Sequence, residues 1–442
     1  MSRNNSNLTR RDFLKRVAVF TAAPMVVPAA VLGRDGKAPA SDRIIFGGIG
    51  IGGRGTHDLR CMLPEKDVQF VAICDSRKDR REAVKKMVDA HYGNQDCAMH
   101  KDIREFLAVR TDIDAVLITT GDRWHALASI FAMRAGKDVY SEKPSAMTIA
   151  EGQAVVETAR RYRRIYQTGA QRLSEANFIF ANELVRTGRL GKVDTVRAHL
   201  APWDAAEMRH DWLPAEPLPP KDEVDWDAWL GPCPWRPYNS AYIKGQWRGH
   251  YDFHTSCIGE WGAHTFAQCQ AAIGCSDTSP VEYNYVNNES GDGMVTRFAN
   301  GIKMIFQREG WRGTCGVRFE GTEGWVSVAD AYEKPDVEPA SLLSEFDKIV
   351  NAYKARTGRP TSREGGLSAM GHMRDLLDCV KSRRQAVANP VVMHRSMSTV
   401  HAANICMWLK RDMRYDPVKE EFVNDPEANR LRSRAMREPW II

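Results

Sequence analysis

Residues 44–55, IIFGGIGIGGRG, read as a short buried strand that runs into a glycine-rich turn. Three of the glycines have the spacing of a turn that holds the pyrophosphate of a dinucleotide. Gly50 permits the tight turn, Gly52 lets the backbone approach the phosphates, and Gly55 lets the next helix pack on the strand. The first N–H groups of that helix then face the phosphates. The pattern predicts a dinucleotide-binding site; the alternative is an ordinary glycine-rich loop between a strand and a helix.

An overlapping register of the same motif starts at Gly48 and ends at Gly53. That register would place its first glycine inside the strand, so the later register is preferred. Gly53 and Arg54 then lie within the turn, and both are predicted to contact the cofactor.

A second apolar run, residues 68–74, ends in Asp75, where a second parallel strand should present an acid to the adenosine ribose. A carboxylate there pairs with the ribose hydroxyls and repels a 2′-phosphate, which favours NAD over NADP. Arg77 leaves the choice open, because a guanidinium two residues further on could bind a 2′-phosphate. Its alternative role is that of a solvated charge in the charged run 77–82.

The composition is that of an ordinary globular protein, with 43% hydrophobic and 27% charged residues. A length of 442 residues fits two domains. The net charge of +6 arises from 62 basic and 56 acidic residues, with no basic stripe interleaved with aromatic residues. We therefore expect no nucleic-acid partner.

The first 33 residues have the form of a twin-arginine export signal. Arg10 and Arg11 precede a moderately apolar run, residues 17–32, and small residues at 29–30 offer a cleavage site. The alternative is an uncleaved helix or membrane anchor, but the run is short and interrupted by prolines, unlike a good membrane span. The segment predicts export by the twin-arginine machinery to the periplasm or beyond.

The ten cysteines are scattered and include no C-x-x-C pair. This spacing predicts buried thiols instead of a disulfide framework or a zinc site. Cys269 and Cys275 are close enough in sequence to leave one disulfide open.

From residue 41 to residue 170, short β-branched runs alternate with helical patterns, as in a doubly wound parallel sheet. This half is predicted to be an α/β Rossmann domain. Its predicted strands are 43–49, 68–74, 114–119, 138–141 and 165–168. Its predicted helices are 54–63, 77–92, 101–109, 125–135 and 148–163.

Residues 171–442 are predicted to form an α+β domain for substrate binding and oligomerisation. Alternating apolar and polar residues predict a large, mainly antiparallel open sheet with one covered face. A long passage rich in Trp and Pro, residues 203–247, is expected to be functional or ordered by packing. The charged tail from Lys419 is expected to pack through Trp440. The predicted strands are 193–200, 281–286, 294–299, 302–308, 315–320 and 324–328, and the predicted helices are 174–187, 366–383 and 395–411.

The stretch Glu142-Lys143-Pro144 follows the strand at 138–141, so it lies at the carboxyl edge of the sheet, where ligands bind in such folds. Pro144 keeps Lys143 extended. An ammonium group here could hydrogen-bond a substrate hydroxyl and stabilise the developing alkoxide during hydride loss. The alternative is a surface lysine in a turn.

With these motifs together, the chain resembles the Gfo/Idh/MocA family of NAD(P)-dependent sugar and polyol oxidoreductases over essentially everything after the signal. With its twin-arginine signal and its Pro/Trp-rich insert, it resembles an exported bacterial branch of that family. The matching motifs are Gly50-x-Gly52-x-x-Gly55, Asp75, Thr119-Thr120 with Trp124-His125, Glu142-Lys143-Pro144, Gly169-x-Gln171-Arg172, Gly188-x-x-Gly191-Lys192-Val193 and Gly262-Ala263-His264.

The resemblance implies that Glu142 and Lys143 lie beside the nicotinamide and that the protein forms a homo-oligomer. It also implies a general acid–base pair, Glu260 and His264, whose i,i+4 spacing places both side chains on one helical face. Glu260 stands where the family commonly has Asp, which puts its direct role in doubt. The predicted cofactor-binding residues are Gly50, Gly52, Gly53, Arg54, Gly55, Asp75, Arg77, Thr119, Trp124, His125, Glu142, Lys143 and Gln171. The predicted substrate-binding residues are Arg172, Tyr251, Asp252, His254 and Trp261.

A metal site is an alternative use of the same region, because His250, His254, Glu260 and His264 have Hx3H and Ex3H spacing. We prefer the simpler interpretation, in which His250 and His254 are polar substrate-binding or core residues, and we predict no metal.

The sequence thus predicts an exported NAD-dependent oxidoreductase that moves hydride between nicotinamide and a ring hydroxyl of a sugar, sugar derivative or polyol. Because free NAD is scarce outside the cytoplasm, a second hypothesis is a glycosidase or lyase that oxidises the sugar ring only transiently. The Tyr-Pro-Thr-His-Gly stretch of the exported N-acetylgalactosaminidases that work this way is absent. A third hypothesis is a non-catalytic sugar- or dinucleotide-binding protein, and the intact Lys143 and His264 argue against it.

Overall fold

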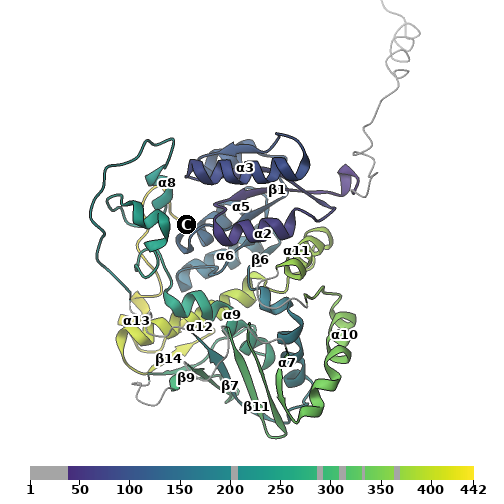
Figure 1. The fold of residues 1–442 in the computed structure, drawn as a ribbon. Helices are drawn as coiled ribbons and strands as arrows, with labels where there is room; N and C mark the ends of the chain where they lie inside the picture. The colour runs from purple at the N-terminus through teal and green to yellow at the C-terminus, as the bar shows by residue number, and fades with distance from the viewer. Residues whose placement is uncertain (1–37, 201–207, 286–291, 308–314, 331–333, 363–368) are drawn as a thin grey trace, which may run out of the picture. The chain divides into compact units, whose positions relative to one another are not determined.

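The computed structural model describes residues 38–200, 208–285, 292–307, 315–330, 334–362 and 369–442. The predicted export signal lies outside these residues, and a short 3₁₀ helix, η1 (Ala40–Asp42), precedes the main fold. Residues from Ile44 to the end form one unit, which Figure 1 shows from purple to yellow.

The first sheet is parallel, and its strand order is β3-β2-β1-β4-β5-β6. The strands are β1 (Ile44–Ile49), β2 (Val68–Cys74), β3 (Ala98–His100), β4 (Ala115–Ile118), β5 (Asp138–Ser141) and β6 (Tyr166–Thr168). The order reverses between β1 and β4, and ligands of doubly wound sheets bind at such a switch point. The predicted Rossmann architecture and its five predicted strands are confirmed. Strand β3 was not predicted, because it has three residues and no apolar run.

Helices cover both faces of this sheet (Figure 1). Alternate residues of β4 point to opposite sides: Val116 and Ile118 belong to a core with α4, α5 and α6, while Ala115 and Leu117 belong to a core with α2, α3 and α11. The last of these helices, α11, comes from the far end of the chain and completes the second face. The bounds are α2 (Gly53–Met62), α3 (Lys78–Tyr92), α4 (Ile103–Val109), α5 (Asp122–Arg134), α6 (Ile149–Tyr162) and α11 (Met370–Ser382).

The second sheet has nine strands in the order β13-β12-β11-β7-β10-β9-β8-β14-β15. Only β7 and β10 pair in parallel among the described neighbouring strands. The predicted mainly antiparallel sheet is therefore confirmed. The strands are β7 (Val193–His199), β8 (Glu282–Asn284), β9 (Asp292–Arg297), β10 (Lys303–Gln307), β11 (Val317–Gly321), β12 (Gly324–Val328), β13 (Asp336–Glu338), β14 (Met413–Asp416) and β15 (Glu421–Phe422).

One face of the second sheet is covered, as the alternation predicts. Met304 and Phe306 of β10 are buried in the core, whereas Lys303 on the same strand is exposed. The covering helices are α7 (Ala176–Arg186), α9 (Ser256–Ala272) and α12 (Pro390–Leu409). Further elements are η2 (Gln171–Ser174), η5 (Ala340–Glu345), α10 (Phe346–Thr357) and α13 (Pro426–Arg430).

The Trp- and Pro-rich passage is ordered by packing where the structure describes it, from residue 208 onward. It contains α8 (Trp226–Leu230) and a π-helical turn, η4 (Tyr242–Gln246). Its own aromatic core is built on Trp226, Trp229 and Tyr242. Figure 1 shows α8 beside the first sheet. We call residues 222–248 the strap.

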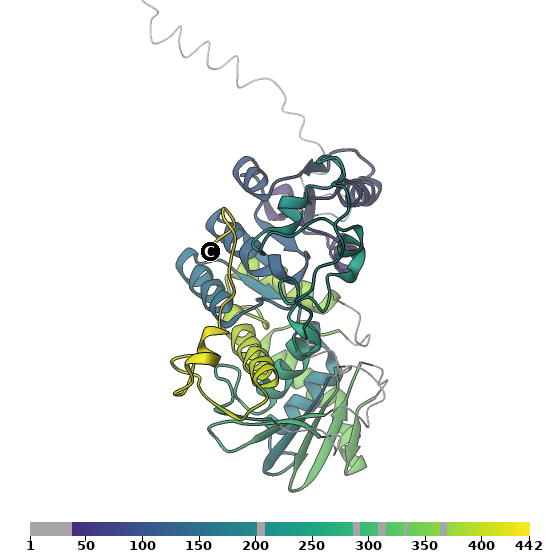
Figure 2. The same ribbon diagram turned by 90° about the vertical axis from the view of Figure 1, so that its left-hand side faces the viewer.

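The C-terminal tail packs through Trp440, as predicted. Figure 2 shows this yellow segment running back from α13 to the helices of the first sheet. Trp440 is 1% exposed and meets the ring of Trp124 edge to face at 5.1 Å, and the Arg104 guanidinium lies 4.3 Å from its ring. Helix α13 and strand β15, two short elements within the tail, were not predicted.

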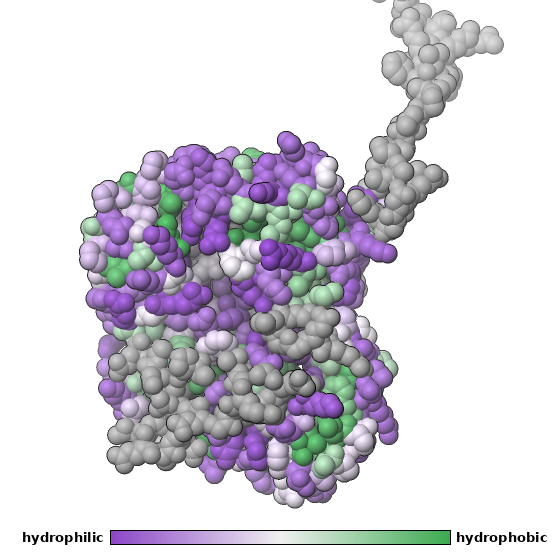
Figure 3. Space-filling view, in the orientation of Figure 1, coloured by the Kyte–Doolittle hydropathy of each residue, from purple (hydrophilic) through white to green (hydrophobic). Residues whose placement is uncertain are grey.

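Figure 3 shows the surface in the orientation of Figure 1, and the upper half, which carries α2 and α3, is mainly hydrophilic. Among the described residues, no helix is long and apolar enough to cross a membrane.

We expect Trp440→Ala to lower the free energy of unfolding by about 3–5 kcal/mol, because it removes a buried aromatic side chain and leaves a cavity. The matched control is Trp235→Ala, since Trp235 is 58% exposed, and its effect should stay within about 0.5 kcal/mol. Chemical denaturation followed by fluorescence measures both values. Equal losses for the two variants would contradict the packing role of Trp440.

Candidate active site and cofactor pocket

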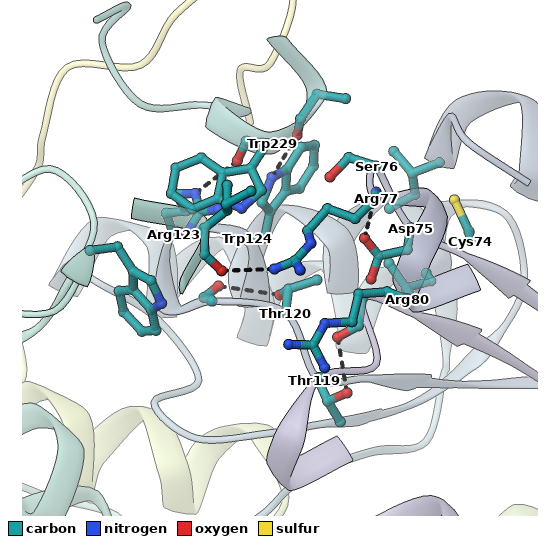
Figure 4. Close-up of a pocket in the computed structure, with 18 of the residues that line it drawn as sticks. Cys74, Asp75, Ser76, Arg77, Arg80, Thr119, Thr120, Arg123, Trp124 and Trp229 are labelled. Carbon is teal, nitrogen blue, oxygen red and sulfur yellow. Dashed lines mark hydrogen bonds between the residues drawn. The ribbon is translucent and has the colours of Figure 1, made fainter. Parts of the chain in front are cut away.

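A cavity of about 640 Å³ lies at the carboxyl ends of β1, β2 and β4, over the switch point (Figure 4). One wall comes from the first sheet, and it contains eight of the predicted cofactor-binding residues. These are Gly50, Gly52, Gly53, Arg54, Asp75, Arg77, Thr119 and Trp124. The opposite wall comes from the strap and from Trp440.

The glycine turn packs against the end of β4. Gly50 has a φ of 67°, and a Cβ there would lie 2.2 Å from Thr120. A Cβ at Gly55 would lie 1.9 Å from the Thr119 hydroxyl, so α2 can approach the sheet only with glycine at this position. By contrast, a Cβ at Gly52 or Gly53 would meet no atom within 4 Å. The turn is therefore tightly packed on the side that faces β4 and open on the side that faces the cavity.

The open side of the turn fits a pyrophosphate. Helix α2 begins after Gly52 without a side-chain cap, so its first N–H groups are available to an anion. Several cationic side chains line the same cavity, namely Arg54, Arg77, Arg80, Lys101, Arg123, Lys244 and Arg248. Gly48 lies within β1, where a Cβ would meet Ile51 and Phe70, which agrees with the preference for the later register.

Asp75 follows β2 at the edge of the cavity (Figure 4). Its Oδ1 accepts a hydrogen bond from the Arg77 backbone N–H at 2.9 Å, and burial raises the pKa of Asp75 to about 6. The Arg77 guanidinium binds both carboxylate oxygens of Asp79, at 3.0 and 2.5 Å, and donates to the Ile243 carbonyl at 2.7 Å. All of its nitrogens thus have partners within the protein.

Glu142 is buried just beyond the end of β5. Its carboxylate accepts hydrogen bonds from the Gln171 amide at 2.6 Å and from the Lys143 backbone N–H at 3.1 Å, and Arg54 lies 3.8 Å away. A Cβ on Gly169 would lie 2.1 Å from the Glu142 carboxylate. The glycine of the Gly169-x-Gln171-Arg172 motif therefore makes room for the glutamate of the Glu142-Lys143-Pro144 motif.

Three predicted cofactor-binding residues, His125, Thr119 and Trp124, hold the cavity walls together. The His125 ring bonds the Pro144 carbonyl at 2.8 Å and the Thr120 carbonyl at 3.1 Å, so it joins two loops at the sheet edge. Thr119 donates to the Gly50 carbonyl at 3.1 Å. The Trp124 indole donates to the Ala228 carbonyl of the strap at 3.0 Å.

Helix α9 carries the predicted acid–base pair beside Lys143. The Lys143 ammonium donates to the Glu260 backbone carbonyl at 2.9 Å and lies 5.6 Å from the Trp261 ring. The Glu260 carboxylate lies 3.3 Å from His254 Nε2 and 3.5 Å from Arg248 Nε. Burial opposes ionisation, but the hydrogen bond from His254 and the charges of Lys143 and Arg248 lower the pKa of Glu260 to about 2. Glu260 is therefore an ionised partner for its neighbours.

His264 is buried one turn further along α9. The Arg172 guanidinium lies 3.0 Å from its Nε2, and the same guanidinium is held by Asp330 at 3.0 and 2.6 Å. Burial and the charges of Arg172 and Lys143 hold the pKa of His264 well below its usual value. The imidazole is therefore neutral at physiological pH, in the form that can accept a proton.

Two predicted substrate-binding side chains lie elsewhere. The Tyr251 ring packs between His210 at 5.0 Å and Trp408 at 5.6 Å in a second cavity of about 650 Å³. The Asp252 carboxylate forms an ion pair with the buried Arg236. His254, Trp261 and Arg172 do come together with Lys143 and His264.

The alternative metal site is not assembled. His250 packs against the rings of Tyr242 and Phe253, inside the aromatic core of the Trp-rich passage. Across the described residues, no three His, Cys, Asp or Glu side chains come together as metal ligands. Cys269 and Cys275 are not joined to each other, and within the described residues none of the ten cysteines forms a disulfide.

Three further residues belong to the site but were missed from sequence. Asp58 is buried, lies 3.1 Å from Arg54, and has a pKa raised well above its usual value by burial and by Glu142. Its i,i+4 spacing from Arg54 was a usable signal. Asp330, which holds Arg172, and Arg248, which pairs with Glu260, follow no recognisable motif.

Two family models match the chain. One, described as the oxidoreductase family with an NAD-binding Rossmann fold, matches residues 44–170. The other, described as the C-terminal alpha/beta domain of the oxidoreductase family, matches residues 182–340 and 366–442. Both models carry the Gfo/Idh/MocA family name.

The curated relatives include a glycosyl hydrolase family 109 protein from Shewanella baltica and another from Shewanella putrefaciens. Each is 29% identical over 231 residues, which cover 46% of this chain and 49% of the relative. The chain thus spans about half the length of the curated relatives it matches.

Solved structures share the fold at low sequence identity. The WlbA dehydrogenase from Chromobacterium violaceum, in complex with NADH and UDP-GlcNAcA, has a TM-score of 0.60 at 16% identity and covers 86% of this chain and 98% of its own. An aldose-aldose oxidoreductase from Caulobacter crescentus has a TM-score of 0.56 at 17% identity, covering 84% and 99%. A putative myo-inositol dehydrogenase from Sinorhizobium meliloti has a TM-score of 0.54 at 17% identity, with the same coverage.

The raised pKa of Asp75 makes its predicted ribose contact testable by pH. With a pKa of about 6, the carboxyl is ionised at pH 8 and mainly protonated at pH 5, where it is a poorer acceptor for ribose hydroxyls. We expect the dissociation constant for NAD⁺ to rise by about tenfold from pH 8 to pH 5. Isothermal titration calorimetry measures it. The same pH dependence in Asp75→Asn would show that another group is responsible.

Proposed function

The chain belongs to the Gfo/Idh/MocA family of oxidoreductases with an NAD-binding Rossmann fold, and from this we propose that it transfers hydride between nicotinamide and a ring hydroxyl carbon of a sugar, sugar derivative or polyol. The observation that carries the proposal is a cluster on helix α9 next to the cofactor cavity. Lys143 bonds Glu260, whose carboxylate lies beside the cavity-lining Arg248, and Arg172 contacts His264 on the same helix. The dinucleotide, when bound, supplies the hydride acceptor or donor.

Two side chains have separate roles in the proposed proton transfer. The Lys143 ammonium donates a hydrogen bond to the substrate oxygen and stabilises the charge that develops there as hydride leaves. His264 is the proposed acceptor of the hydroxyl proton, and burial and its cationic neighbours, which keep it neutral, also make it a weak base. Glu260 stays ionised and holds His254 and Arg248 in place. Trp261 offers an apolar face beside Lys143.

NAD is the proposed cofactor in preference to NADP. Asp75 lines the cavity at the end of β2, where its carboxylate favours ribose hydroxyls and repels a 2′-phosphate. Arg77, which the sequence offered as a competing ligand for a 2′-phosphate, is already bound to Asp79 and to Ile243. Its engagement supports NAD.

The proposal includes export through the twin-arginine machinery to the periplasm or beyond, and assembly as a homo-oligomer. The support for export is the Arg10-Arg11 pair followed by an apolar run. The support for oligomerisation is resemblance to the family alone.

A second candidate function is a glycosidase that uses the cofactor transiently, and the glycosyl hydrolase family 109 relatives favour it. In such a reaction the enzyme oxidises a ring hydroxyl to a ketone, and the ketone acidifies the neighbouring C–H. Loss of that proton expels the aglycone, water adds to the resulting double bond, and the hydride returns to the ketone. The net reaction is hydrolysis without change of oxidation state.

We expect Lys143→Met to lower kcat by about 10²–10⁴-fold, the usual contribution of a positioned proton donor or acceptor. The matched control is Lys192→Met, because the Lys192 side chain is 77% exposed and pairs with Asp194; it should retain full turnover. Steady-state rates on the best substrate measure both. Unchanged turnover in Lys143→Met would show that Lys143 takes no part in the reaction, whereas a wild type without turnover on any substrate of the panel would favour the non-catalytic binding protein.

The two catalytic candidates separate in one experiment. We expect the purified protein, once denatured, to release NAD that mass spectrometry identifies. The native protein is then incubated with a panel of aryl glycosides without added NAD. Release of aglycone would favour the glycosidase. If a free sugar instead changes the nicotinamide fluorescence of the bound cofactor, and no aglycone is released, the oxidoreductase would be supported.

A further inference from the structure

We propose that the strap is the second wall of the dinucleotide site and holds the cofactor captive, so that NAD acts as a prosthetic group and not as a freely exchanging cosubstrate. This inference rests on the proposed function, because it takes the cavity to be the NAD site. The family's dinucleotide-binding region ends at residue 170, whereas Ala228, Trp229, Ile243, Lys244, Gly245, Trp247 and Arg248 of the strap line the same cavity.

The strap is fastened to the adenosine edge of the cavity by main-chain contacts. The Lys78 N–H donates to the Glu223 carbonyl at 2.9 Å, and the Asp225 N–H donates to the Ser76 carbonyl at 3.0 Å. These contacts place the strap directly beside Asp75. Arg77 connects the two walls of the cavity, because its backbone N–H binds Asp75 while its guanidinium binds the Ile243 carbonyl of the strap at 2.7 Å.

Charged side chains fasten the same edge. Lys78 pairs with Glu223 at 2.9 Å, and Lys101 pairs with Asp222. The Arg81 guanidinium donates to the Asp222 carbonyl at 3.1 Å. Each contact joins a helix or loop of the first sheet to the strap.

Helix α5 holds the middle of the strap (Figure 4). The Arg123 guanidinium lies 3.6 Å from the Trp229 ring and donates to the Trp229 carbonyl at 2.9 Å. The Trp124 indole donates to the Ala228 carbonyl at 3.0 Å. From the C-terminal tail, Arg437 pairs with Asp227 at 2.6 Å and donates to the Gly231 carbonyl at 2.9 Å.

The far end of the strap reaches the predicted acid–base element. Arg248 Nε lies 3.5 Å from the Glu260 carboxylate, and the Trp247 ring packs on His254 at 5.5 Å. Residues 243–248 therefore run from the adenosine edge to the catalytic helix. A dinucleotide that spans the cavity lies between this segment and the glycine turn.

Release of the dinucleotide then requires the strap to open, which breaks contacts at the edge, the middle and the far end. A captive cofactor must be returned to its oxidised form in place. The hydride it accepts must therefore go back to the keto intermediate of the same sugar or to a second carbonyl substrate.

The experiment measures the dissociation rate of NADH by stopped-flow fluorescence, with excess ADP-ribose as the trap. We expect slow release from the wild type and a release at least tenfold faster from Arg77→Ala, which unfastens the strap but keeps the backbone contact to Asp75. Arg110→Ala is the matched control, since Arg110 also binds both carboxylate oxygens of an aspartate two positions on, Asp112, and donates to a backbone carbonyl, that of Val71, but is not part of the cavity lining. Its release rate should stay within twofold of the wild type.

A second variant tests the strap from outside the cavity. The double change Asp222→Ala and Glu223→Ala removes two exposed ion pairs and should speed NADH release in the same direction. Hydrogen exchange of residues 222–248 should slow when NAD⁺ is bound to the wild type.

The outcomes separate the two proposals. Acceleration in Arg77→Ala without acceleration in the Asp222→Ala and Glu223→Ala double variant would mean that pocket charge, not the strap, controls release. Rapid release from the wild type would likewise overturn the captive cofactor while leaving the proposed function intact. Absence of any NAD binding would overturn the proposed function itself.

Discussion

The site depends on the close packing of the glycine turn against the end of β4. Gly50 and Gly55 leave no room for a Cβ beside Thr120 and Thr119, so α2 lies directly on the sheet where the strand order reverses. This contact leaves Gly52 and Gly53 open to the cavity and points the start of α2 at it. A cavity shaped for a pyrophosphate follows from that one steric constraint.

A second close contact joins two motifs that are 27 residues or more apart in the chain. Gly169 makes room for the Glu142 carboxylate, which Gln171 then binds, and Lys143 is thereby fixed at the sheet edge. The second domain supplies the remainder of this cluster, because α9 brings Glu260 and His264 to Lys143 and the loop after β12 brings Asp330 to Arg172. The cluster is thus assembled across the boundary between the two sheets.

Electrostatics give the two members of the predicted acid–base pair opposite characters. Glu260 is surrounded by His254, Lys143 and Arg248, which keep it ionised. His264 is buried beside Arg172 and Lys143, which keep it neutral. A carboxylate that binds its neighbours and an imidazole that can accept a proton therefore sit one helical turn apart. This division gives Glu260 a role in holding His254 and Arg248, even though the family commonly has the shorter Asp.

The Rossmann sheet, the glycine turn, Asp75 and the Lys143 edge could be predicted from sequence, because each depends on short-range patterns: apolar runs, glycine spacing and a proline. The same holds for Glu260 and His264, whose spacing on one helix places them together.

Strand β3 and helix α13 were missed because they are too short to carry a period. The side chains of Tyr251 and Asp252 lie away from the cluster, because contacts with Trp408 and Arg236, distant or unpatterned in sequence, orient them. The strap as a second wall, the engagement of Arg77, and the pairing of Asp330 with Arg172 were decided only by tertiary structure. Each joins residues more than 100 positions apart through hydrogen bonds and ion pairs that leave no periodic trace in the chain.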